Sequence, residues 1–230
     1  MYDIEFNGRL ASEYGIFPVD KYINIPSAER DISTIEVKGR DGELHIDNKR
    51  WKPIQFPINF NYKFRNTHPN KVQREVKKWL KGSGILRIGY DEDYFYKVYE
   101  VSISNIDILS GKVDFVATIK IEPFAYSQEG TYEIYNPKEL YNSGYSSNPV
   151  YRIVGEGVCE LAVNDNAITI NVGQEIIIDT DKLLCYREGV NLNTTVNGDI
   201  SKLVLQEGMN TISITDGFEL YIKPGWRDLI

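Results

Sequence analysis

Residues 51–65 read WKPIQFPINFNYKFR and hold the clearest alternation of apolar and polar positions in the chain. Every second position is apolar from Ile54 through Phe56, Ile58, Phe60 and Tyr62 to Phe64. A period of two is typical of an antiparallel β-strand with one buried and one solvated face. Pro57 falls among the polar positions, and because proline has no N–H to give to a ladder, it predicts an edge strand or a bulge. An edge of this kind could pair with another subunit.

The period changes in residues 67–84, THPNKVQREVKKWLKGSG. Four apolar residues fall on one helical stripe, which predicts a helix packed on the sheet: Val72, Val76, Trp79 and Leu80. We expect Thr67 to cap its N-terminus and Gly82 or Gly84 to end it. The rest of the helix is basic, which favours a solvated face over a docking surface for an acidic neighbour.

The stretch EVKGRDGELHI, residues 36–46, predicts a β-hairpin with a two-residue turn at Asp41 and Gly42. This turn would place Arg40 opposite Glu43 and Gly39 opposite Leu44. Turn chemistry and a cross-strand ion pair then account for the charges, so we favour a structural role for GRDG over adhesion or catalysis.

Further strand patterns continue to residue 126, so residues 1–126 are expected to form an antiparallel sheet system with one helix. Residues 128–149 are rich in Asn, Ser, Gly, Pro and Tyr, which predicts a domain boundary. Beyond it lie short strands at regular spacing. Among them is a hairpin that pairs Leu161 with Ile170 and Val163 with Ile168 across a turn at Asp165-Asn166. The spacing predicts a β-sandwich over residues 127–230.

Composition limits the classes of function. The chain has 230 residues, of which 42% are apolar, and a net charge of −7. An acidic chain is a poor general binder of nucleic acid or of anionic membranes, because phosphate contacts need a basic excess. Cys159 and Cys185 lie in apolar runs and are expected to be buried thiols rather than a disulfide. The N-terminus has no secretory pattern and no run is long enough to span a bilayer, so we expect a soluble protein made in the cytoplasm.

Candidate chemistry is sparse. The two histidines, His45 and His68, have no partners spaced for a triad, and no zinc, calcium or nucleotide motif is present. We therefore expect no catalytic residues, no metal and no cofactor, and we predict that the protein is not an enzyme. Sugar binding needs only an exposed aromatic ring beside polar groups, for which Tyr145, Tyr151 and Trp226 are candidates. Core or interface packing is the alternative for each ring.

Several segments, in order, resemble the distal tail protein family of siphovirus-type phages. They are VKGRDGELHI, WLKGSGIL followed by YDEDYFYKVYEVS, IKIEPFAYS, the lead-in at residues 142–149, and EGMNTISI with the ending KPGWRDL. Each is weak alone, whereas their order and spacing are specific. LVLQEG at residues 203–208 departs from the aromatic-proline pattern that is usual before the last strands.

The resemblance implies a hexameric ring built by the N-terminal domains, each joined to a galectin-like β-sandwich whose last strand could return to the first domain. Such a ring is a hub at the virion tail tip, assembled in the host cytoplasm. It joins the tail tube protein to a tail-tip protein, can carry receptor-binding or baseplate proteins, and lets DNA pass as cargo. Gly39, Arg40, Asp41, Gly42 and Pro57 become candidate ring-interface residues. The alternatives are a stand-alone carbohydrate-binding module and a cell-wall hydrolase.

Overall fold

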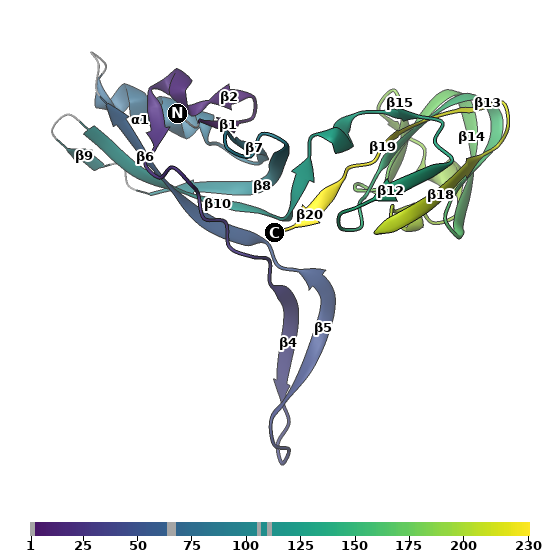
Figure 1. Cartoon of the computed structure of the whole chain (residues 1–230), viewed down its shortest axis with the longest axis horizontal. Helices are drawn as coiled ribbons and strands as arrows, with labels where there is room; N and C mark the ends of the chain where they lie inside the picture. Colours follow the sequence, from purple (N-terminus) through teal and green to yellow (C-terminus); the bar gives the residue numbers. More distant parts are fainter. Residues whose placement is uncertain (1–2, 64–67, 105–106, 110–111) are drawn as a thin grey trace. The chain divides into compact units, whose positions relative to one another are not determined.

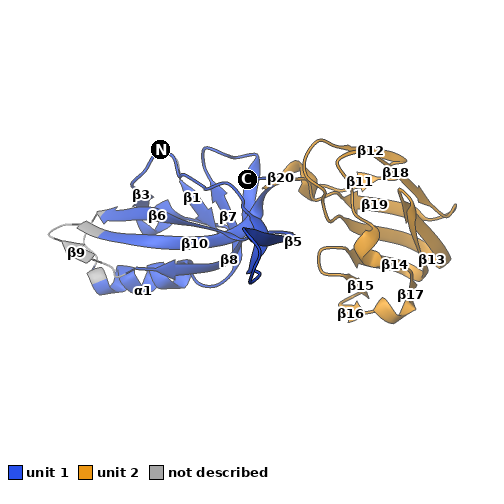
Figure 2. Cartoon of the chain, turned by 90° about the horizontal axis from the view of Figure 1, so that it is seen from below, with its two compact units in different colours: residues 1–125, 229–230 blue, residues 126–228 orange. Residues whose placement is uncertain are grey.

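The computed structural model describes residues 3–63, 68–104, 107–109 and 112–230 and divides the chain into two compact units. Unit 1 comprises residues 1–125 and 229–230, and unit 2 comprises residues 126–228 (Figures 1 and 2). The chain is mainly β, as the sequence predicts.

Unit 1 contains one large antiparallel sheet with the strand order β2-β1-β7-β8-β10-β6-β3, in which β9 and β20 also pair with β10. The strands of this sheet are β1 (Ile4–Phe6), β2 (Arg9–Leu10), β3 (Ile16–Pro18), β6 (Ile54–Lys63), β7 (Gly84–Ile88), β8 (Tyr94–Ile103), β9 (Asp107–Leu109), β10 (Lys112–Ser127) and β20 (Arg227–Leu229). The last two residues of β10 and the first two of β20 belong to unit 2. After β20, Ile230 accepts a hydrogen bond from Ala28 N–H and donates one to the Pro123 carbonyl. The last residue is thereby tied into unit 1.

Strand β6 confirms the alternation read from the sequence as far as Tyr62, and Phe64 lies outside the described residues. Its apolar positions from Ile54 to Tyr62 are buried, and the polar positions between them are mostly exposed. The whole strand pairs antiparallel with β10, and β3 pairs with its other edge only between Phe60 and Tyr62. Pro57 is exposed, lies opposite Thr118 of β10, and falls outside the stretch that β3 covers.

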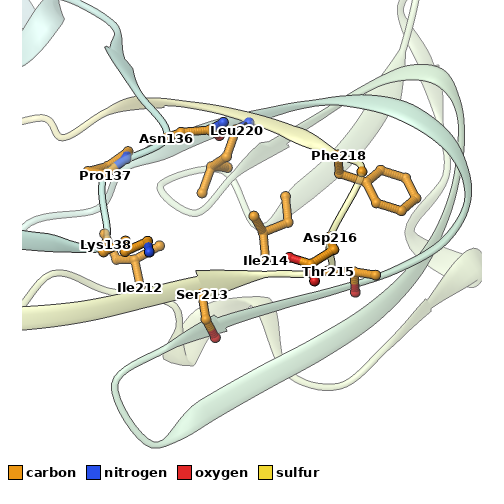
Figure 3. A pocket seen from close by; sticks show the side chains of 11 residues that line it. Asn136, Pro137, Lys138, Ile212, Ser213, Ile214, Thr215, Asp216, Phe218 and Leu220 are labelled. Atoms are coloured by element: carbon orange, nitrogen blue, oxygen red, sulfur yellow. Dashed lines mark hydrogen bonds between the residues drawn. The ribbon is translucent and has the colours of Figure 1, made fainter.

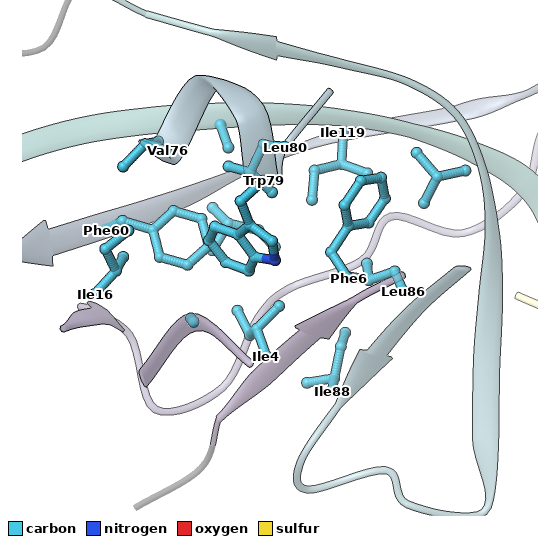
Figure 4. Packing of buried hydrophobic residues seen from close by; sticks show 14 of the residues in the cluster. Ile4, Phe6, Ile16, Phe60, Val76, Trp79, Leu80, Leu86, Ile88 and Ile119 are labelled. Carbon is cyan, nitrogen blue, oxygen red and sulfur yellow. The ribbon is translucent and has the colours of Figure 1, made fainter. Parts of the chain in front are cut away.

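Helix α1 (Pro69–Trp79) packs its predicted stripe onto this sheet. Val72, Val76, Trp79 and Leu80 are all buried. The Trp79 ring stacks on Tyr14, with the ring centroids 5.5 Å apart. It also meets the Phe60 ring edge-on, with the centroids 6.0 Å apart (Figure 4). Its indole N–H also donates to the Arg9 carbonyl at 3.1 Å, so the largest side chain of the stripe leaves no buried donor unsatisfied.

The ends of the helix differ from the prediction. Thr67 lies outside the described residues, and His68 is the N-cap, its Nδ1 accepting from Asn70 N–H at 3.3 Å. The helix ends at Trp79, with Leu80 as the C-cap, before either predicted glycine. Gly82 then takes a φ of 83° and Gly84 opens β7, so both residues belong to the exit of the chain from the helix.

Unit 2 is a second antiparallel β-structure, with one path of strands β11-β19-β13-β14-β15-β16 and with β18 joining β12 to β13. Its strands are β11 (Ile134–Tyr135), β12 (Glu139–Asn142), β13 (Val150–Val163), β14 (Asn166–Asp179), β15 (Leu184–Arg187), β16 (Val190–Asn191), β17 (Val196–Asn197), β18 (Gly208–Ile214) and β19 (Glu219–Lys223). Strand β13 pairs with β19 through residues 150–154 and with β18 through residues 161–163. One long strand therefore serves both parts of the sandwich.

The β13–β14 hairpin corrects the predicted register. Leu161 lies opposite Ile168, and Val163 lies opposite Asn166, so the turn is Asn164-Asp165 rather than Asp165-Asn166. Asn164 takes the left-handed backbone conformation, φ 54°, which asparagine tolerates better than most residues. The predicted apolar residues still share the buried face, because the register differs by an even step.

The second core is separate from the first and contains both cysteines. Cys159 and Cys185 are fully buried free thiols that form no disulfide, as the sequence predicts. Burial raises the pKa of the Cys185 thiol to about 11, so this thiol is protonated and inert at neutral pH.

Candidate assembly interface

Strands β4 (Arg30–Glu36) and β5 (Glu43–Trp51) form a two-stranded sheet of their own. Figure 1 shows this hairpin projecting from the β-sheet of unit 1. Within the described residues neither strand pairs with any other strand. A lone two-stranded hairpin is marginally stable in water. The hairpin has no further strand beside it to stabilise it, so we consider it a candidate surface for contact with another protein.

The loop that joins β4 to β5 is longer than the two-residue turn that the sequence predicts. Leu44 lies opposite Ile35, not Gly39, and Glu43 lies opposite Glu36, not Arg40. A two-residue type I′ turn would need positive φ at both Asp41 and Gly42. Gly39 and Gly42 have it, at 84° and 79°, whereas Asp41 does not, so the chain reverses over residues 37–42.

The four GRDG residues thus form an exposed tip rather than a paired strand end. Arg40 N–H donates to the Val37 carbonyl at 3.1 Å, which closes a turn within the tip. A side chain added at Gly39 or Gly42 would meet open space, so both glycines are required for their backbone angle alone. The predicted ion pair of Arg40 with Glu43 is wrong, because the two residues are not cross-strand neighbours.

One face of the hairpin is apolar and open to solvent. The register places Ile35 opposite Leu44, and Ile46 follows Leu44 on the same face. Their exposed fractions are 46%, 40% and 42%. The opposite face is mainly polar, with Thr34 opposite His45 and Glu36 opposite Glu43, and it also carries Ile32 opposite Asp47. No other element of the described chain covers the apolar face. An exposed apolar face of this kind is typical of a surface that binds another protein.

The base of the hairpin is held by ion pairs. Arg30 Nε lies 3.0 Å from Asp47 Oδ1, and Arg50 Nε lies 2.5 Å from Asp31 Oδ2. Hydrogen bonds from these guanidinium groups lower the pKa of Asp47 and of Asp31. The Arg30 guanidinium also lies over the Trp51 ring at 5.1 Å. Polar contacts therefore fix the base, and the apolar face begins beyond them.

The predicted sugar-stacking residues lie in unit 2. Tyr151 is fully buried and donates its hydroxyl to the Leu203 carbonyl at 2.8 Å, so its ring offers no face to a ligand. Tyr145 and Trp226 are half-buried, and Tyr145 N–H bonds to the carbonyl of Arg227, the residue after Trp226. Trp226 packs against the second core. The backbone thus brings two of the three candidates near each other.

A cavity of about 410 Å³ opens in unit 2 between the 136–138 segment and the β18–β19 turn (Figure 3). Ile212 and Leu220 in its lining are buried members of the second core. Asn136 Oδ1 accepts from Leu220 N–H at 2.6 Å and is thereby committed to the fold.

Across the described chain no group of three or more His, Cys, Asp or Glu side chains is placed to hold a metal ion. No helix among the described residues is long and apolar enough to cross a membrane.

Comparison with known proteins gives a clear answer for the fold. No protein-family model and no curated protein matches the chain. Among solved structures, the chain is similar to the SPP1 Dit (gp 19.1) protein, described as a paradigm of the hub adsorption apparatus in phages that infect Gram-positive hosts. The TM-score is 0.68 at 10% identity, and the match covers 100% of this chain and 99% of that one.

The chain shares the SPP1 Dit fold. A chain of the phage P2 baseplate, in its activated conformation with Ca, is also similar, with a TM-score of 0.55 at 9% identity. That match covers 100% of this chain and 98% of the other. Both matches cover the whole of this chain, so the similarity extends over both units. It is not limited to the β-sandwich of unit 2, a fold that many unrelated proteins share.

Proposed function

We propose that this chain is a structural hub at the far end of a long, non-contractile phage or prophage tail. Six copies close a ring that joins the tail tube to the tail-tip or baseplate proteins and lets DNA through its lumen. The observation that carries the proposal is the end-to-end likeness to the SPP1 hub protein. An adhesion hub needs surfaces rather than a reaction centre, and the proposal assigns no catalytic role to any residue.

The hairpin supplies the contact between copies in this proposal. A cyclic ring uses head-to-tail interfaces, in which one surface of each copy meets a different surface of the next. The open face of Ile35, Leu44 and Ile46 is suited to lie on such a neighbour, because association would remove three apolar side chains from water. Arg40 and Asp41 at the tip would then meet polar groups of the neighbour, with Gly39 and Gly42 shaping the tip.

The position of Pro57 and the net charge of the chain also agree with a ring through which DNA passes. Pro57 lies on a part of β6 that β3 leaves uncovered, and we place it at the ring interface as well. The net charge of −7 disfavours tight binding of DNA phosphates, which suits a passage that must release its cargo. The tube and tip proteins would meet the two faces of the ring, and receptor-binding proteins its periphery.

A paired substitution tests the proposed interface. Leu44→Asp puts a charge on the apolar face, and Thr34→Asp puts the same charge on the opposite face of the same hairpin. Burying a leucine is worth about 1.5–3 kcal/mol, so Leu44→Asp should weaken each contact at least tenfold. Native mass spectrometry of the full chain should show hexamers for wild type and Thr34→Asp and smaller species for Leu44→Asp.

Location provides the test of the function itself. Immunogold labelling of intact virions with an antibody to this chain should place gold at the distal end of the tail. Particles with complete tails that lack this polypeptide at the tip would refute the hub. Equal assembly of both Asp variants would instead refute only the role of the hairpin face.

A further inference from the structure

The outer face of unit 2 carries a continuous row of large side chains across five strands. Tyr135 of β11 lies opposite Tyr221 of β19, and Tyr221 lies opposite Arg152 of β13. Arg152 in turn lies opposite Ile177 of β14, and Ile177 opposite Tyr186 of β15. Residues separated by up to 86 positions in the sequence are thus cross-strand neighbours.

Strand alternation shows that this row points outward. The next residues along four of the strands, Ile222, Tyr151, Ile178 and Cys185, are fully buried in the second core. Side chains of successive residues point to opposite faces of a sheet. Tyr135 accordingly has 57% of its surface exposed, and the other four residues of the row are half-buried. The row is therefore a solvent-facing platform on a rigid, well-packed sheet.

Contacts within the platform hold its rings in fixed positions. The rings of Tyr135 and Tyr221 have centroids 5.1 Å apart, and the Arg152 guanidinium lies 3.8 Å from the centroid of Tyr221. Glu133 holds Arg152 through two hydrogen bonds of 3.0 and 2.7 Å. Tyr221 donates its hydroxyl to Glu219 at 2.9 Å. Because these side chains are already ordered, a ligand would lose little of its affinity to fixing them.

The charges around the rings limit what the platform can bind. Glu133 and Glu175 both pair with Arg152, and Glu219 accepts from the Tyr221 hydroxyl. These three carboxylates outnumber the two cations beside them, Arg152 and Lys223, the second of which acts on Glu133. An excess of carboxylates repels phosphates and acidic sugars. The same oxygens are strong acceptors for hydroxyl donors. Strands β19, β13 and β14 are each paired on both sides here, so a ligand meets side chains rather than free backbone groups.

We propose that Tyr135, Tyr221 and Arg152, with Glu133 and Glu219, form a binding site for a neutral saccharide. One face of a pyranose ring is lined by C–H groups of slightly positive character, which fits the electron-rich face of a tyrosine ring. Its hydroxyls would donate to Glu133 and Glu219 and accept from Arg152. The site is distinct from the three aromatic residues picked out by the sequence, and it does not depend on the hub function.

The test uses the full chain and a glycan array of neutral oligosaccharides built from glucose, galactose, mannose, rhamnose and N-acetylhexosamines. Saturation-transfer difference NMR and calorimetry then measure binding of each positive glycan. Tyr135→Ala and Tyr221→Ala should each weaken binding by about five- to tenfold, whereas Tyr135→Phe should retain it because the ring face is kept. Tyr141→Ala is the matched control, since Tyr141 is 66% exposed but lies on β12, outside the row.

The outcomes are decisive in both directions. Binding that falls for the alanine variants of the row and persists in Tyr135→Phe and Tyr141→Ala supports the saccharide site. The proposal is overturned if no neutral glycan on the array binds, or if a bound glycan ignores the row. It is equally overturned if the row variants abolish binding of a tail protein while glycan binding is absent. Thermal melting of each variant confirms that the fold is intact.

Discussion

Gly155 shows how one residue can be required by packing at a distance. Its φ is 156°, and an added Cβ would lie 2.3 Å from Cδ1 of Phe218. Gly157, two positions further along β13, has a φ of 104° but opens onto empty space. The two glycines share a strand and a strained backbone, whereas only Gly155 has a neighbouring ring in the position of its missing side chain.

We predict that Gly155→Ala destabilises unit 2 more than Gly157→Ala does. Both substitutions force alanine into a backbone conformation that favours glycine, and Gly155→Ala also pushes the Phe218 ring aside, which costs about 1–3 kcal/mol more. Urea unfolding followed by circular dichroism measures the difference. Because Phe218 packs against the second core, Phe218→Ala is the reference, and Gly155→Ala should cost less in that background than in wild type. Equal effects of Gly155→Ala and Gly157→Ala would contradict the packing explanation.

At the scale of single elements, the β4–β5 hairpin is stabilised mainly by ion pairs, whereas the other long strands are stabilised by burial of their apolar side chains. Most of its residues are exposed, and the ordered contacts that fix its base are the ion pairs of Arg30 with Asp47 and of Arg50 with Asp31. Helix α1 is the contrary case, because its basic side is solvated and its buried stripe holds it to the sheet. Elements held by charge respond to pH, and elements held by burial do not.

We predict that Arg30→Gln raises the pKa of Asp47 toward its ordinary value. In the folded protein this pKa is lowered, first by the hydrogen bond from Arg30. A lowered folded pKa means that the contribution of the pair to stability is present above the unfolded pKa of about 3.9 and is lost as pH falls through the folded value. NMR titration of side-chain carboxyl carbons measures the shift.

The control for this prediction lies in the same hairpin. The pKa of Asp31 is lowered chiefly by Arg50, a separate partner, so Arg30→Gln should leave the titration of Asp31 in place. A shift of both aspartates together would show that the substitution disrupts the hairpin as a whole. An unchanged Asp47 would refute the ion pair.

At the scale of the whole molecule, the residues that the structure describes form two hydrophobic cores that share no residue. Each unit buries its own core, and the chain enters unit 2 after residue 125 and rejoins unit 1 at residue 229. In the proposed hub this division separates tasks, since unit 1 carries the assembly hairpin and unit 2 carries the tyrosine platform. Each surface can then change without disturbing the core beneath the other.

We predict that matched core substitutions act on separate unfolding transitions. Ile119→Val in unit 1 and Ile153→Val in unit 2 remove the same methylene from fully buried sites. Each should cost about 0.5–1.5 kcal/mol and lower the melting temperature of its own unit by roughly 2–10 °C. Differential scanning calorimetry measures both transitions, and a single transition that both variants shift equally would show that the units unfold together.

The sequence by itself determined the features that depend on neighbours along the chain. The alternation of β6, the stripe of α1 and the buried cysteines all follow from local periodicity, because side chains at fixed spacing share a face in a strand or helix. The hairpins were located correctly for the same reason. Their registers were not, because Gly39, Gly42 and Asn164 set the turns through backbone angles that residue type alone leaves open.

Only the tertiary structure decided which surfaces remain open. Tyr151 and Tyr135 are both tyrosines in strands, yet one is buried and the other is 57% exposed. Pairing between distant strands brings Tyr135, Arg152 and Tyr221 into one row and leaves Ile35, Leu44 and Ile46 without cover. Such neighbours are set by topology and by the free energy of burying one face rather than the other, which no local pattern encodes.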